Sequence, residues 1–566
     1  MSPRVSIVTP VYETPASLLR DAIDSVLEQT FPDWELLLVD DHSEAPHVRE
    51  VLDAAESEDP RIKVLHRTEN GGIVAASNDA LEVATGEFVA FLDHDDRLHP
   101  TALEKVVGAF DRHPDADYVY TDEDKLDDLG LRRHPFHKPD WSPTRFRCQM
   151  YTCHLSTFRR SIVEEVGGLR PEFEGSQDYD LVLRVTERAR RVVHIPEALY
   201  HWRMTETSVA AGDASVKWYA YEAGTRAIQQ HLDRVGIPAT VSMNEDHPGV
   251  YHLHHALTEH PSVSIVIPTR GTWRQVHGAS MNLVVNCVRS IVERSTYPNY
   301  DIVVVADVDT PLGSIQEMEQ LAGDRLKVVP WEGPFHFSRK VNLGALHSTG
   351  EYLLFLNDDT EVITPDWIEA MMMHAAEKDV GAVGAKLFFA DGRIQHAGVA
   401  ANVAPSHVYY GFPSDHGGYA NVLRLASDYL AVTAACMLTP RAAFDAVGGL
   451  SLELPINYND VDYCVKLRHR GWRVVFTPEA RLYHYETSSR PIGEVDTAEL
   501  DQLHGRWLDY CVHDPFYNPN FVPGQVDYMT PAHLTDGTTL PHRPTAPMFE
   551  RVDPATVDLD ELLRVT

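Results

Sequence analysis

The sequence predicts an α/β protein with two tandem domains, each built on a mostly parallel sheet, with a helical connector between them and an irregular tail. Two observations support this prediction. The run at residues 5–12 returns at residues 263–270, and residues 78–95 match residues 342–359. A repeat of this length is a duplicated domain, since solenoid repeats are much shorter. Within each copy, apolar runs alternate with helical patterns, which is typical of a parallel sheet covered on both faces.

The elements of the first copy follow in order. Residues 5–8 are an apolar run that we expect to be a buried strand, and residues 17–29 have the spacing of an amphipathic helix. Residues 34–39 and 87–92 are rich in Val, Leu and Phe and are predicted as further strands. Both of these strands end in acidic residues. Parallel sheets bind ligands at the carboxyl ends of their strands, so we expect functional residues there.

The remaining boundaries follow from composition. We place the first domain at residues 1–204 and the second at residues 261–510. Residues 205–260 are expected to hold a helix at 216–235, followed by a connector that contains His and Pro. Residues 511–566 are rich in Pro, His and Asp with little periodicity, so we expect an extended tail over the surface.

The charge balance restricts the partners. The chain has 49 basic and 84 acidic residues, a net charge of −35. Such an excess repels nucleic acid and anionic lipid headgroups, so nucleic-acid binding is not expected. It also repels a nucleotide diphosphate, unless a divalent cation and a few local Arg or Lys residues reverse the sign in the pocket.

The compartment is predicted from cysteines and hydropathy. Six scattered cysteines without metal-site spacing favour reduced thiols in the cytosol, and we expect no disulfide between Cys148 and Cys153. No apolar run approaches the roughly 20 residues that span a bilayer, and no signal peptide precedes the first strand pattern. We therefore expect a cytoplasmic protein, either soluble or bound peripherally to the inner face of the membrane.

An acidic loop follows the third expected strand of each copy. Asp93 and Asp95 are two residues apart, a spacing at which two carboxylates can present oxygens to one hard cation. A lone pair of this kind is weak evidence, because loops are often acidic. The second copy has Asn357, Asp358 and Asp359 at the matching place. Asp359 aligns with Asp95, and we expect both to be direct metal ligands.

A second acidic position begins a later helix in each copy. Asp178 and Asp460 follow a Gly-Gly-Leu turn and precede a strand that ends in Tyr-His. An Asp at this place commonly caps the helix, and for one Asp alone that is the stronger interpretation. Near a bound sugar, the same carboxylate can accept a proton as a general base. The histidines that end the unit, His201 and His484, are either packing residues or metal ligands through neutral imidazole.

The ordered series of motifs resembles family 2 glycosyltransferases, which have the GT-A fold. In the first copy the resemblance rests on residues 9–13, 39–41 and 93–95 and on the later acid and His. In the second copy, residues 335–342, 356–360, 459–464 and 514–520 resemble transferases of bacterial surface polysaccharides, including O-antigen and rhamnan types. The resemblance covers about residues 4–520 and is more specific than any single motif.

The resemblance implies a bifunctional, metal-dependent inverting hexosyl- or deoxyhexosyltransferase. Its implied cofactor is Mg²⁺ or Mn²⁺, and its partners are a nucleotide-sugar donor and a growing surface glycan that can be lipid-linked. Asp178 and Asp460 would be the bases. The metal ligands would be Asp93, Asp95, His201, Asp359 and His484. The nucleotide sugar would be held by Pro10, Tyr12, Glu13, Asp40, Asp41, Asp93, Pro268, Thr269, Arg270, Asp307, Arg339, Lys340 and Asp358.

Arg339 and Lys340 have no basic counterparts in the first copy, where Ala75 and Ala76 align. They can supply positive charge to a diphosphate, or they can lie on a solvated helix face. Two other hypotheses stay open. One domain can be a degenerate module that binds the glycan or nucleotide. Alternatively, the protein can be a nucleotidyltransferase, although residues 9–14 contain neither the Gly nor the Lys that such enzymes usually carry there.

Overall fold

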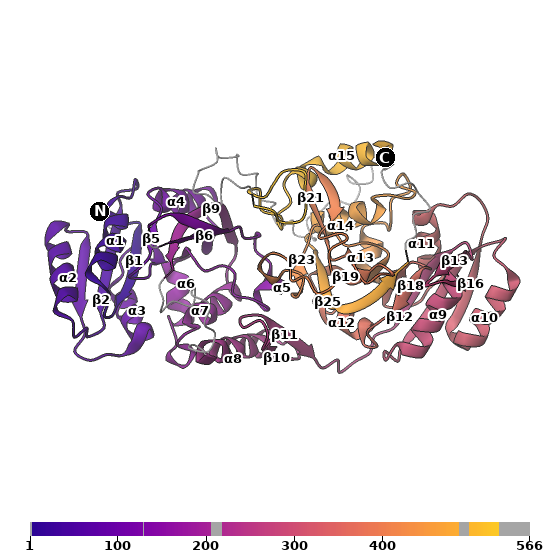
Figure 1. Ribbon diagram of the computed structural model, residues 1–566, viewed down its shortest axis with the longest axis horizontal. Helices are drawn as coiled ribbons and strands as arrows, with labels where there is room; N and C mark the ends of the chain where they lie inside the picture. The colour runs from indigo at the N-terminus through magenta and orange to yellow at the C-terminus, as the bar shows by residue number, and fades with distance from the viewer. Residues whose placement is uncertain (1–2, 128, 205–217, 486–496, 531–566) are drawn as a thin grey trace.

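Two α/β halves lie side by side along the long axis of the computed structural model, which describes residues 3–127, 129–204, 218–485 and 497–530 (Figure 1). Each half has one large mixed sheet with helices packed against it. The predicted class, an α/β protein with two tandem sheets, is confirmed.

The first sheet contains β1 (Val5–Val11), β2 (Trp34–Asp40), β3 (Ile62–His66), β4 (Phe88–Phe91), β5 (Arg97–Leu98), β6 (Tyr118–Leu126), β7 (Arg132–Phe136), β8 (Ser156–Arg159) and β9 (Val192–Arg203). Its order is β3-β2-β1-β4-β8-β6-β9-β5, and β7 pairs with β6. β1 runs parallel to β2 and β4, whereas β8 is antiparallel to β4 and β6. β1 is buried along its whole length, which explains its uninterrupted apolar sequence.

The helices of the first half are α1 (Ala16–Leu27), α2 (Pro46–Glu58), α3 (Gly72–Val83), α4 (Ala102–Arg112), α5 (Pro143–Phe146), α6 (Arg160–Val166), α7 (Gln177–Thr186) and α8 (Trp218–Val235). The strands predicted at residues 5–8, 34–39 and 87–92 and the helix predicted at residues 17–29 correspond to β1, β2, β4 and α1. The helix predicted at residues 216–235 corresponds to α8, and residues 216 and 217 lie outside the described residues.

The second sheet contains β12 (Val263–Thr269), β15 (Tyr300–Asp307), β16 (Leu326–Trp331), β17 (Tyr352–Leu356), β18 (Thr360–Val362), β19 (Val380–Phe388), β20 (Ile394–His396), β23 (Ser427–Asp428), β24 (Cys436–Pro440) and β25 (Arg473–His484). Its main path is β16-β15-β12-β17-β24-β19-β25-β18. Replacing each strand by its counterpart in the first copy reproduces the order of the first sheet. The duplication seen in the sequence is therefore a duplication of topology.

The other elements of the second half are α9 (Leu283–Arg294), α10 (Leu312–Ala322), α11 (Phe337–Leu346), α12 (Trp367–Ala375), α13 (Arg441–Ala446), α14 (Asn459–His469) and α15 (Thr497–Val512), with the hairpins β13 (Trp273–Val276) to β14 (Ala279–Asn282) and β21 (Val399–Asn402) to β22 (Ala404–His407). α7 and α14 occupy matching places after β8 and β24. They carry the two aspartates that the sequence marks as candidate bases.

The connector packs into the first half. After α8, β10 (Ala239–Met243) and β11 (Tyr251–His255) form an antiparallel hairpin that the sequence analysis did not predict. Ile228, Leu232 and Tyr251 belong to the same apolar cluster as Tyr179 and Leu181 of α7. The connector therefore stabilises the helix on which Asp178 lies.

The segment after α15 corrects a prediction. We expected a tail over the surface from residue 511, but Tyr517, Phe521 and Tyr528 are buried in the main apolar cluster of the second half. Aromatic residues at irregular spacing give no periodic signal, yet each can bury about 150–250 Å². Residues 531–566 of the expected tail lie outside the described residues.

Arg473 of β25 connects the halves. Its guanidinium donates to Thr144 of the first half at 2.6 Å and to Asp428 and Glu377 of the second half at 3.1 and 2.8 Å. Arg147 of the first half bonds the same Glu377 at 2.8 Å. Asp428 is fully buried, so these bonds compensate a charge that has no access to water.

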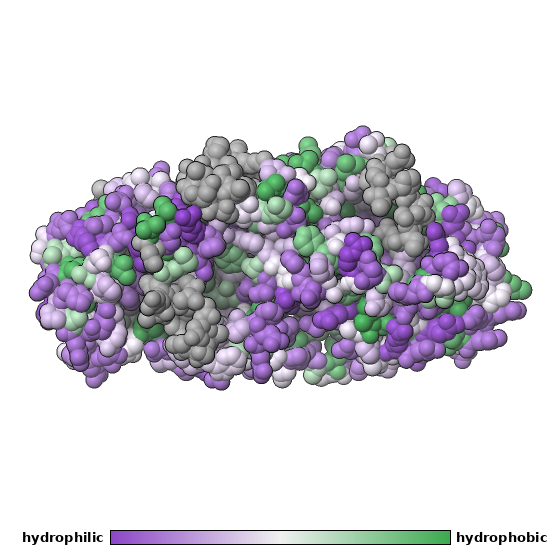
Figure 2. All heavy atoms as spheres, viewed as in Figure 1, coloured by the Kyte–Doolittle hydropathy of each residue, from purple (hydrophilic) through white to green (hydrophobic). Residues whose placement is uncertain are grey.

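The surface agrees with the acidic composition. Hydrophilic residues dominate the face seen in Figure 2, and apolar residues form scattered patches on it. Within the described ranges, the helices are too short or too polar to cross a bilayer. All six cysteines are free, as expected for Cys148 and Cys153.

Removing the Arg473 guanidinium should destabilise the protein. Because Asp428 and Glu377 would stay buried without their cation, we expect Arg473→Met to lower the free energy of unfolding by about 3–5 kcal/mol. Calorimetric melting measures this change. Arg393→Ala is the matched control, since the Arg393–Asp391 pair is exposed and its loss should leave Tm unchanged. Equal Tm values for wild type and Arg473→Met would contradict the role of Arg473.

Candidate active sites

The acidic loops lie at the carboxyl ends of the central strands, as predicted. Asp93 to Asp96 follow β4, and Asn357 to Asp359 follow β17. The loops are fixed to neighbouring strands by backbone bonds, from Leu92 N to Val8 O at 3.0 Å and from Asn357 N to Ala435 O at 3.0 Å.

In the first half, Asp96 organises the acidic loop. Its buried carboxylate accepts the Tyr200 hydroxyl at 2.6 Å and the backbone N–H of Arg203 at 2.7 Å. Burial, together with the charges of Asp93 and Asp95, raises the pKa of Asp96 well above its usual range. Burial also raises the pKa of Asp95, with His94 opposing this effect and Asp93 adding to it. This loop holds more negative charge than its protein partners compensate, an environment that favours a bound cation.

A shared asparagine positions the helix that carries each candidate base. In the first half, the Asn78 amide bonds both the N–H and the C=O of Leu169 at 2.9 Å. In the second half, Asn342 bonds Leu450 in the same way at 3.0 and 2.8 Å. The preceding glycine has a positive φ in both copies, and a Cβ on Gly168 would come within 2.8 Å of the Asn78 side chain. The repeated Asn and Gly-Gly-Leu motifs are therefore two parts of one clamp.

The clamp places Asp178 near the first acidic loop. Its Oδ1 accepts the backbone N–H of Tyr179 at 2.8 Å at the beginning of α7. Burial raises the pKa of Asp178, His154 opposes the rise, and the charge of Asp93 contributes to it. The aspartates predicted as base and as ligand thus share one electrostatic environment.

Asp460 occupies the corresponding place in the second half. Its Oδ1 accepts the N–H of Val461 at 2.9 Å, and its Oδ2 accepts the N–H of Ala434 at 3.2 Å. The next residue, Ala435, accepts the N–H of Asn357. One short loop therefore contacts both the candidate base and the candidate metal loop.

The two predicted histidines differ in their surroundings. His484 Nε2 lies 3.1 Å from Asp359 Oδ1 and 3.2 Å from Asn357 Nδ2, so the structure brings these candidate metal residues together. His201 Nδ1 instead lies 2.7 Å from Asp124 Oδ1 of β6. The structure thus places His201 beside Asp124, and the described contacts include no bond from its ring to Asp93 or Asp95.

One extra residue in the second copy explains the difference. The pairing jumps from Ile195 to Tyr200 in β9 and from Thr477 to Leu482 in β25, so the two strands are equally irregular. The second copy, however, has Arg481 between Ala480 and Leu482, whereas Leu199 directly follows Ala198. His484 therefore lies opposite Thr360. His201 lies opposite Arg97, one residue further along. A shift by one residue turns a side chain to the other face of the sheet.

His154 is a site residue that the sequence analysis missed. Its ring stacks on Tyr200 with centroids 4.6 Å apart, and the Tyr200 hydroxyl bonds Asp96. Burial alone would lower the pKa of His154, but the hydrogen bond and charge of Glu123 outweigh it and raise the pKa to about 9. The strand pairing places Ala435 at the position that matches His154 in the second half. Comparison of the two copies therefore could not mark His154 as a site residue.

The candidate donor sets fit a hard divalent cation. Asp359, Asn357 and His484 can hold it in the second half, and Asp93 and Asp95 in the first. Among the described residues, one further group of metal-ligating side chains lies close together: Glu123, Cys153 and His154. Its Glu123 already bonds the buried Lys138 ammonium at 3.1 Å, so we assign no cation there.

The acidic residues predicted to hold the first nucleotide also support local structure. Asp41 accepts the N–H groups of Gly71 and Gly72 at 2.9 and 2.8 Å, at the beginning of α3. Asp40 accepts Ser43 N–H at 2.9 Å and lies 2.9 Å from the His66 ring. Glu13 accepts backbone N–H groups just before α2. Pro10 is the last residue but one of β1, and Tyr12, which follows that strand, is 48% exposed.

In the second half, Lys340 is a buried cation and not a surface one. Its ammonium donates to Asp307 Oδ1 and to Thr269 O, both at 2.6 Å, and connects β12 to β15. Arg270 lies 3.5 Å from Asp307 and is largely exposed, next to Pro268 at the end of β12. Arg339 is exposed on α11, as expected for a solvated helix face.

Asp358 contacts the same group of residues. Its Oδ2 accepts the Thr269 hydroxyl at 2.5 Å. Burial and the charge of Asp359 raise the pKa of Asp358 to about 7, against the opposing effect of Lys340. Asp358 therefore connects the predicted nucleotide residues to the predicted metal residues.

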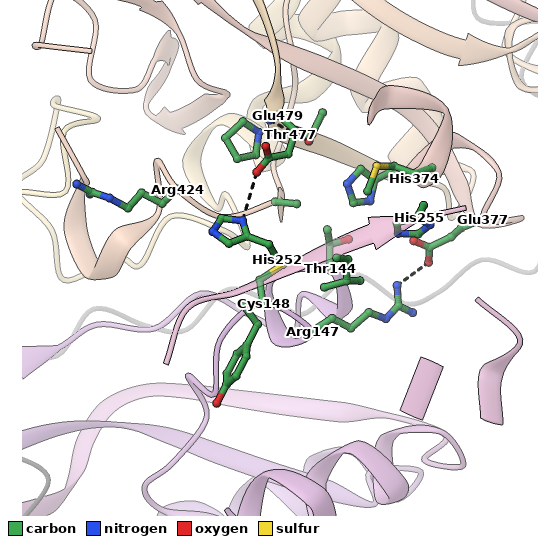
Figure 3. A pocket seen from close by; sticks show the side chains of 15 residues that line it. Thr144, Arg147, Cys148, His252, His255, His374, Glu377, Arg424, Thr477 and Glu479 are labelled. Carbon is green, nitrogen blue, oxygen red and sulfur yellow. Dashed lines mark hydrogen bonds and ion pairs between the residues drawn. The ribbon is translucent and has the colours of Figure 1, made fainter. Parts of the chain in front are cut away.

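A cavity at the junction of the halves lies away from these residues (Figure 3). Its volume of about 30 Å³ is room for about two water molecules. Figure 3 shows Arg147 turned toward Glu377 and His252 toward Glu479, at 2.8 and 3.3 Å. Because the space is small and these polar groups bond each other, we assign no ligand to it.

Comparison with known families matches both halves. The sequence profile described as "Glycosyl transferase family 2" matches residues 6–167, and the one described as "Glycosyltransferase like family 2" matches residues 260–509.

Three curated relatives extend this comparison. The chain is 40% identical to the uncharacterized protein y4gI of Sinorhizobium fredii, over 93% of this chain and 58% of that protein. It is 35% identical to the O-antigen biosynthesis protein RfbC of Myxococcus xanthus, over 95% of this chain and 42% of that protein. It is 30% identical to EpsE of Bacillus subtilis, named as a glycosyltransferase, over 36% of this chain and 73% of that protein. The chain thus spans about half the length of the first two relatives.

The raised pKa of Asp358 predicts a pH-dependent stability in the absence of metal. The unfolded chain releases this proton near pH 4, whereas the folded protein holds it until about pH 7, so stability falls as pH rises between these values. We expect Asp358→Asn to stabilise the protein by on the order of 2 kcal/mol at pH 8 and to have little effect at pH 4. Melting in EDTA at both pH values measures the effect. Asp309→Asn, which changes an exposed carboxylate, should show no such difference, and a Tm gain at pH 4 equal to that at pH 8 would refute the assignment.

Proposed function

Since the chain belongs to glycosyltransferase family 2, with one such domain in each half, we propose that it is a bifunctional, metal-dependent inverting transferase of bacterial surface-polysaccharide synthesis. One observation carries the proposal: each half places an acidic loop after its central strand and an aspartate at the start of a clamped helix. The name of the relative RfbC supports the link to surface polysaccharide. The donor would be a nucleotide-activated hexose or deoxyhexose.

Asp178 and Asp460 would each accept a proton from an acceptor hydroxyl. As that oxygen bonds the anomeric carbon, the bond from this carbon to the nucleoside diphosphate breaks, and the configuration inverts. One carboxylate is enough, since no covalent intermediate forms. The raised pKa of Asp178 makes its carboxylate a stronger base.

The diphosphate gains negative charge as it leaves. A divalent cation bound by Asp93 and Asp95, or by Asp359 and His484, would stabilise that charge on an otherwise acidic protein. We assign this cation to the aspartates and not to His201, because His201 lies opposite Arg97, where the second copy has Tyr483 and not His484. In the second site, Arg270 is an exposed cation beside Asp307, while Lys340 holds Asp307 in place.

The nucleotide would lie along the carboxyl ends of β1 and β2, and of β12 and β15. Pro10, Tyr12 and Thr269 belong to this edge. Asp40, Asp41 and Glu13 would act mainly by holding the loops that border it, since backbone N–H groups already bond their oxygens.

The second candidate is a chain with one catalytic domain and one binding domain. It is favoured by the differences between the sites, where Asn357 replaces Asp93 and Ala435 replaces His154. The acceptor would be a growing glycan, and a lipid-linked acceptor would bring the protein to the inner face of the membrane.

Separate substitution of the bases distinguishes the two candidates. We expect Asp178→Asn and Asp460→Asn each to lower one of two transfers by about 10²- to 10⁴-fold and to spare the other. Products formed from a panel of nucleotide sugars with Mn²⁺ measure both transfers. Glu82→Gln and Asp501→Asn, which change exposed acids, are the controls. Unchanged turnover in one base variant would identify that domain as the binding module. Release of pyrophosphate in place of nucleoside diphosphate would overturn the proposal itself.

Metal binding should depend on one histidine and not on the other. His484 contacts Asp359, so we expect His484→Gln to weaken Mn²⁺ binding at the second site by about 10- to 100-fold. His201→Gln should leave Mn²⁺ binding unchanged, because in the strand register His201 takes the place of Tyr483 and not of His484. Electron paramagnetic resonance of free Mn²⁺ during titration of the full chain measures both effects. Equal losses in the two variants would contradict these placements.

A further inference from the structure

The segment at residues 514–520 reaches from the second half into the first. We propose that this segment, here called the strap, positions the first active site, with Asn518 acting through Lys138 on the loop that carries His154. The proposal rests on the proposed function of the first site. It makes the C-terminal part of the chain necessary for transfer in the N-terminal domain.

The strap is anchored in both halves. On the second half, Asp514 accepts the N–H groups of Ala401 and Phe516, both at 2.8 Å. On the first half, Pro515 O accepts the N–H of Asp140 at 2.8 Å. Asn520 also donates to Pro196 O at 2.8 Å. The bonds of Asp514 and Pro515 hold the neighbouring Asn518 in place, whereas the Asn520 bond fixes only the end of the strap.

Asn518 is buried, and both acceptors of its side-chain N–H groups are in the first half. Its amide donates to Asp122 Oδ2 at 2.9 Å and to the backbone carbonyl of Lys138 at 2.8 Å. Asp122 in turn accepts the N–H of Lys138 at 2.9 Å. The backbone of Lys138 is therefore held on both sides, by a strand of its own domain and by the strap.

Lys138 connects the strap to the loop that holds His154. Its fully buried ammonium donates to the carbonyls of Cys153 and His154, both at 2.8 Å, and to Glu123 at 3.1 Å. Glu123 also accepts the N–H of His154. The loop before β8 is thus fixed mainly by one cation, whose position depends on Asn518.

The loop presents His154 to the reacting region. The His154 ring stacks on Tyr200, whose hydroxyl lies 3.3 Å from Asp93 N and bonds Asp96. His154 also acts electrostatically on Asp178. A continuous series of contacts therefore runs from Asn518 to the acidic loop of the first site, while the base Asp178 is reached through the charge of His154. The second site has Ala435 in place of His154, and no residue of the strap is bonded to the loop at residues 433–435 among the contacts described for that half.

The test uses the full chain with one site silenced at a time. In the Asp460→Asn background, we expect Asn518→Leu to lower kcat of the first site by about tenfold or more and to leave KM for the donor unchanged. In the Asp178→Asn background, the same change should leave turnover of the second site intact, which also shows that the chain is folded. Asn520→Ala is the matched control, because it removes a bond to the first half that does not lead to Lys138. We expect it to change neither site.

A second measurement does not depend on transfer. Cys153 lies in the loop and is partly exposed, whereas the other five cysteines are buried. We expect Asn518→Leu to speed modification of Cys153 by a thiol reagent several-fold, as located by peptide mass, and Asn520→Ala not to. Lys138→Met should have the same effect, and the double variant should add little to either single change.

The outcomes separate the two proposals. If the wild type uses no nucleotide sugar but Cys153 is labelled faster in Asn518→Leu, the proposed transferase function is refuted. The proposed effect of the strap on the His154 loop then stands. If the wild type transfers sugar normally and Asn518→Leu changes neither kcat nor Cys153 labelling, the proposed role of the strap is wrong. If the Leu variant does not fold, Asn518→Ser is measured in its place, with the same outcomes.

Discussion

Carboxylates that are buried in a strongly acidic chain need cations or several hydrogen-bond donors, and this need governs how the halves and the sites are built. Asp428 is compensated by Arg473 of its own half and by Ser142 of the other half, and Asp122 by two histidines, a backbone N–H and Asn518. The acidic loops after β4 and β17 are different, because their neighbours compensate only part of the charge and the pKa of Asp358 stays raised. The places where compensation is incomplete are the places where a cation would bind.

The two sites share a layout but differ in which strand or loop supplies the histidine that lies near the acidic residues. In the second half, His484 comes from the strand that the repeat predicts and lies beside Asp359. In the first half, the strand is one residue shorter, so His201 lies beside Asp124, and His154 from another loop lies near the acidic residues. Two sites that started from one duplicated domain have thus come to hold their histidines differently. A ligand bound in the first half would therefore meet different side chains from one bound in the second half.

The halves are coupled by buried polar contacts and not by apolar packing alone. Arg473 and Arg147 meet at Glu377, and the strap inserts Asn518 beside Asp122. Polar contacts of this kind require fixed geometry, because a buried group that loses its partner is costly. The relative placement of the two sites is therefore part of the fold. A glycan that visits both sites would meet them at a constant separation.

The sequence by itself determined the α/β class, the duplication, the main strands and the position of the acidic loops, because these depend on local periodicity and on identity between the copies. It also identified Asp178 and Asp460 as a matching pair, although not their surroundings. Only the tertiary structure showed the orientation of His201, which takes the place of Tyr483 because its strand has no counterpart of Arg481. It alone showed His154 near the first site and Asn518 buried between the halves. Long-range pairing fixes these positions, and neither periodicity nor the repeat records which distant segments will meet.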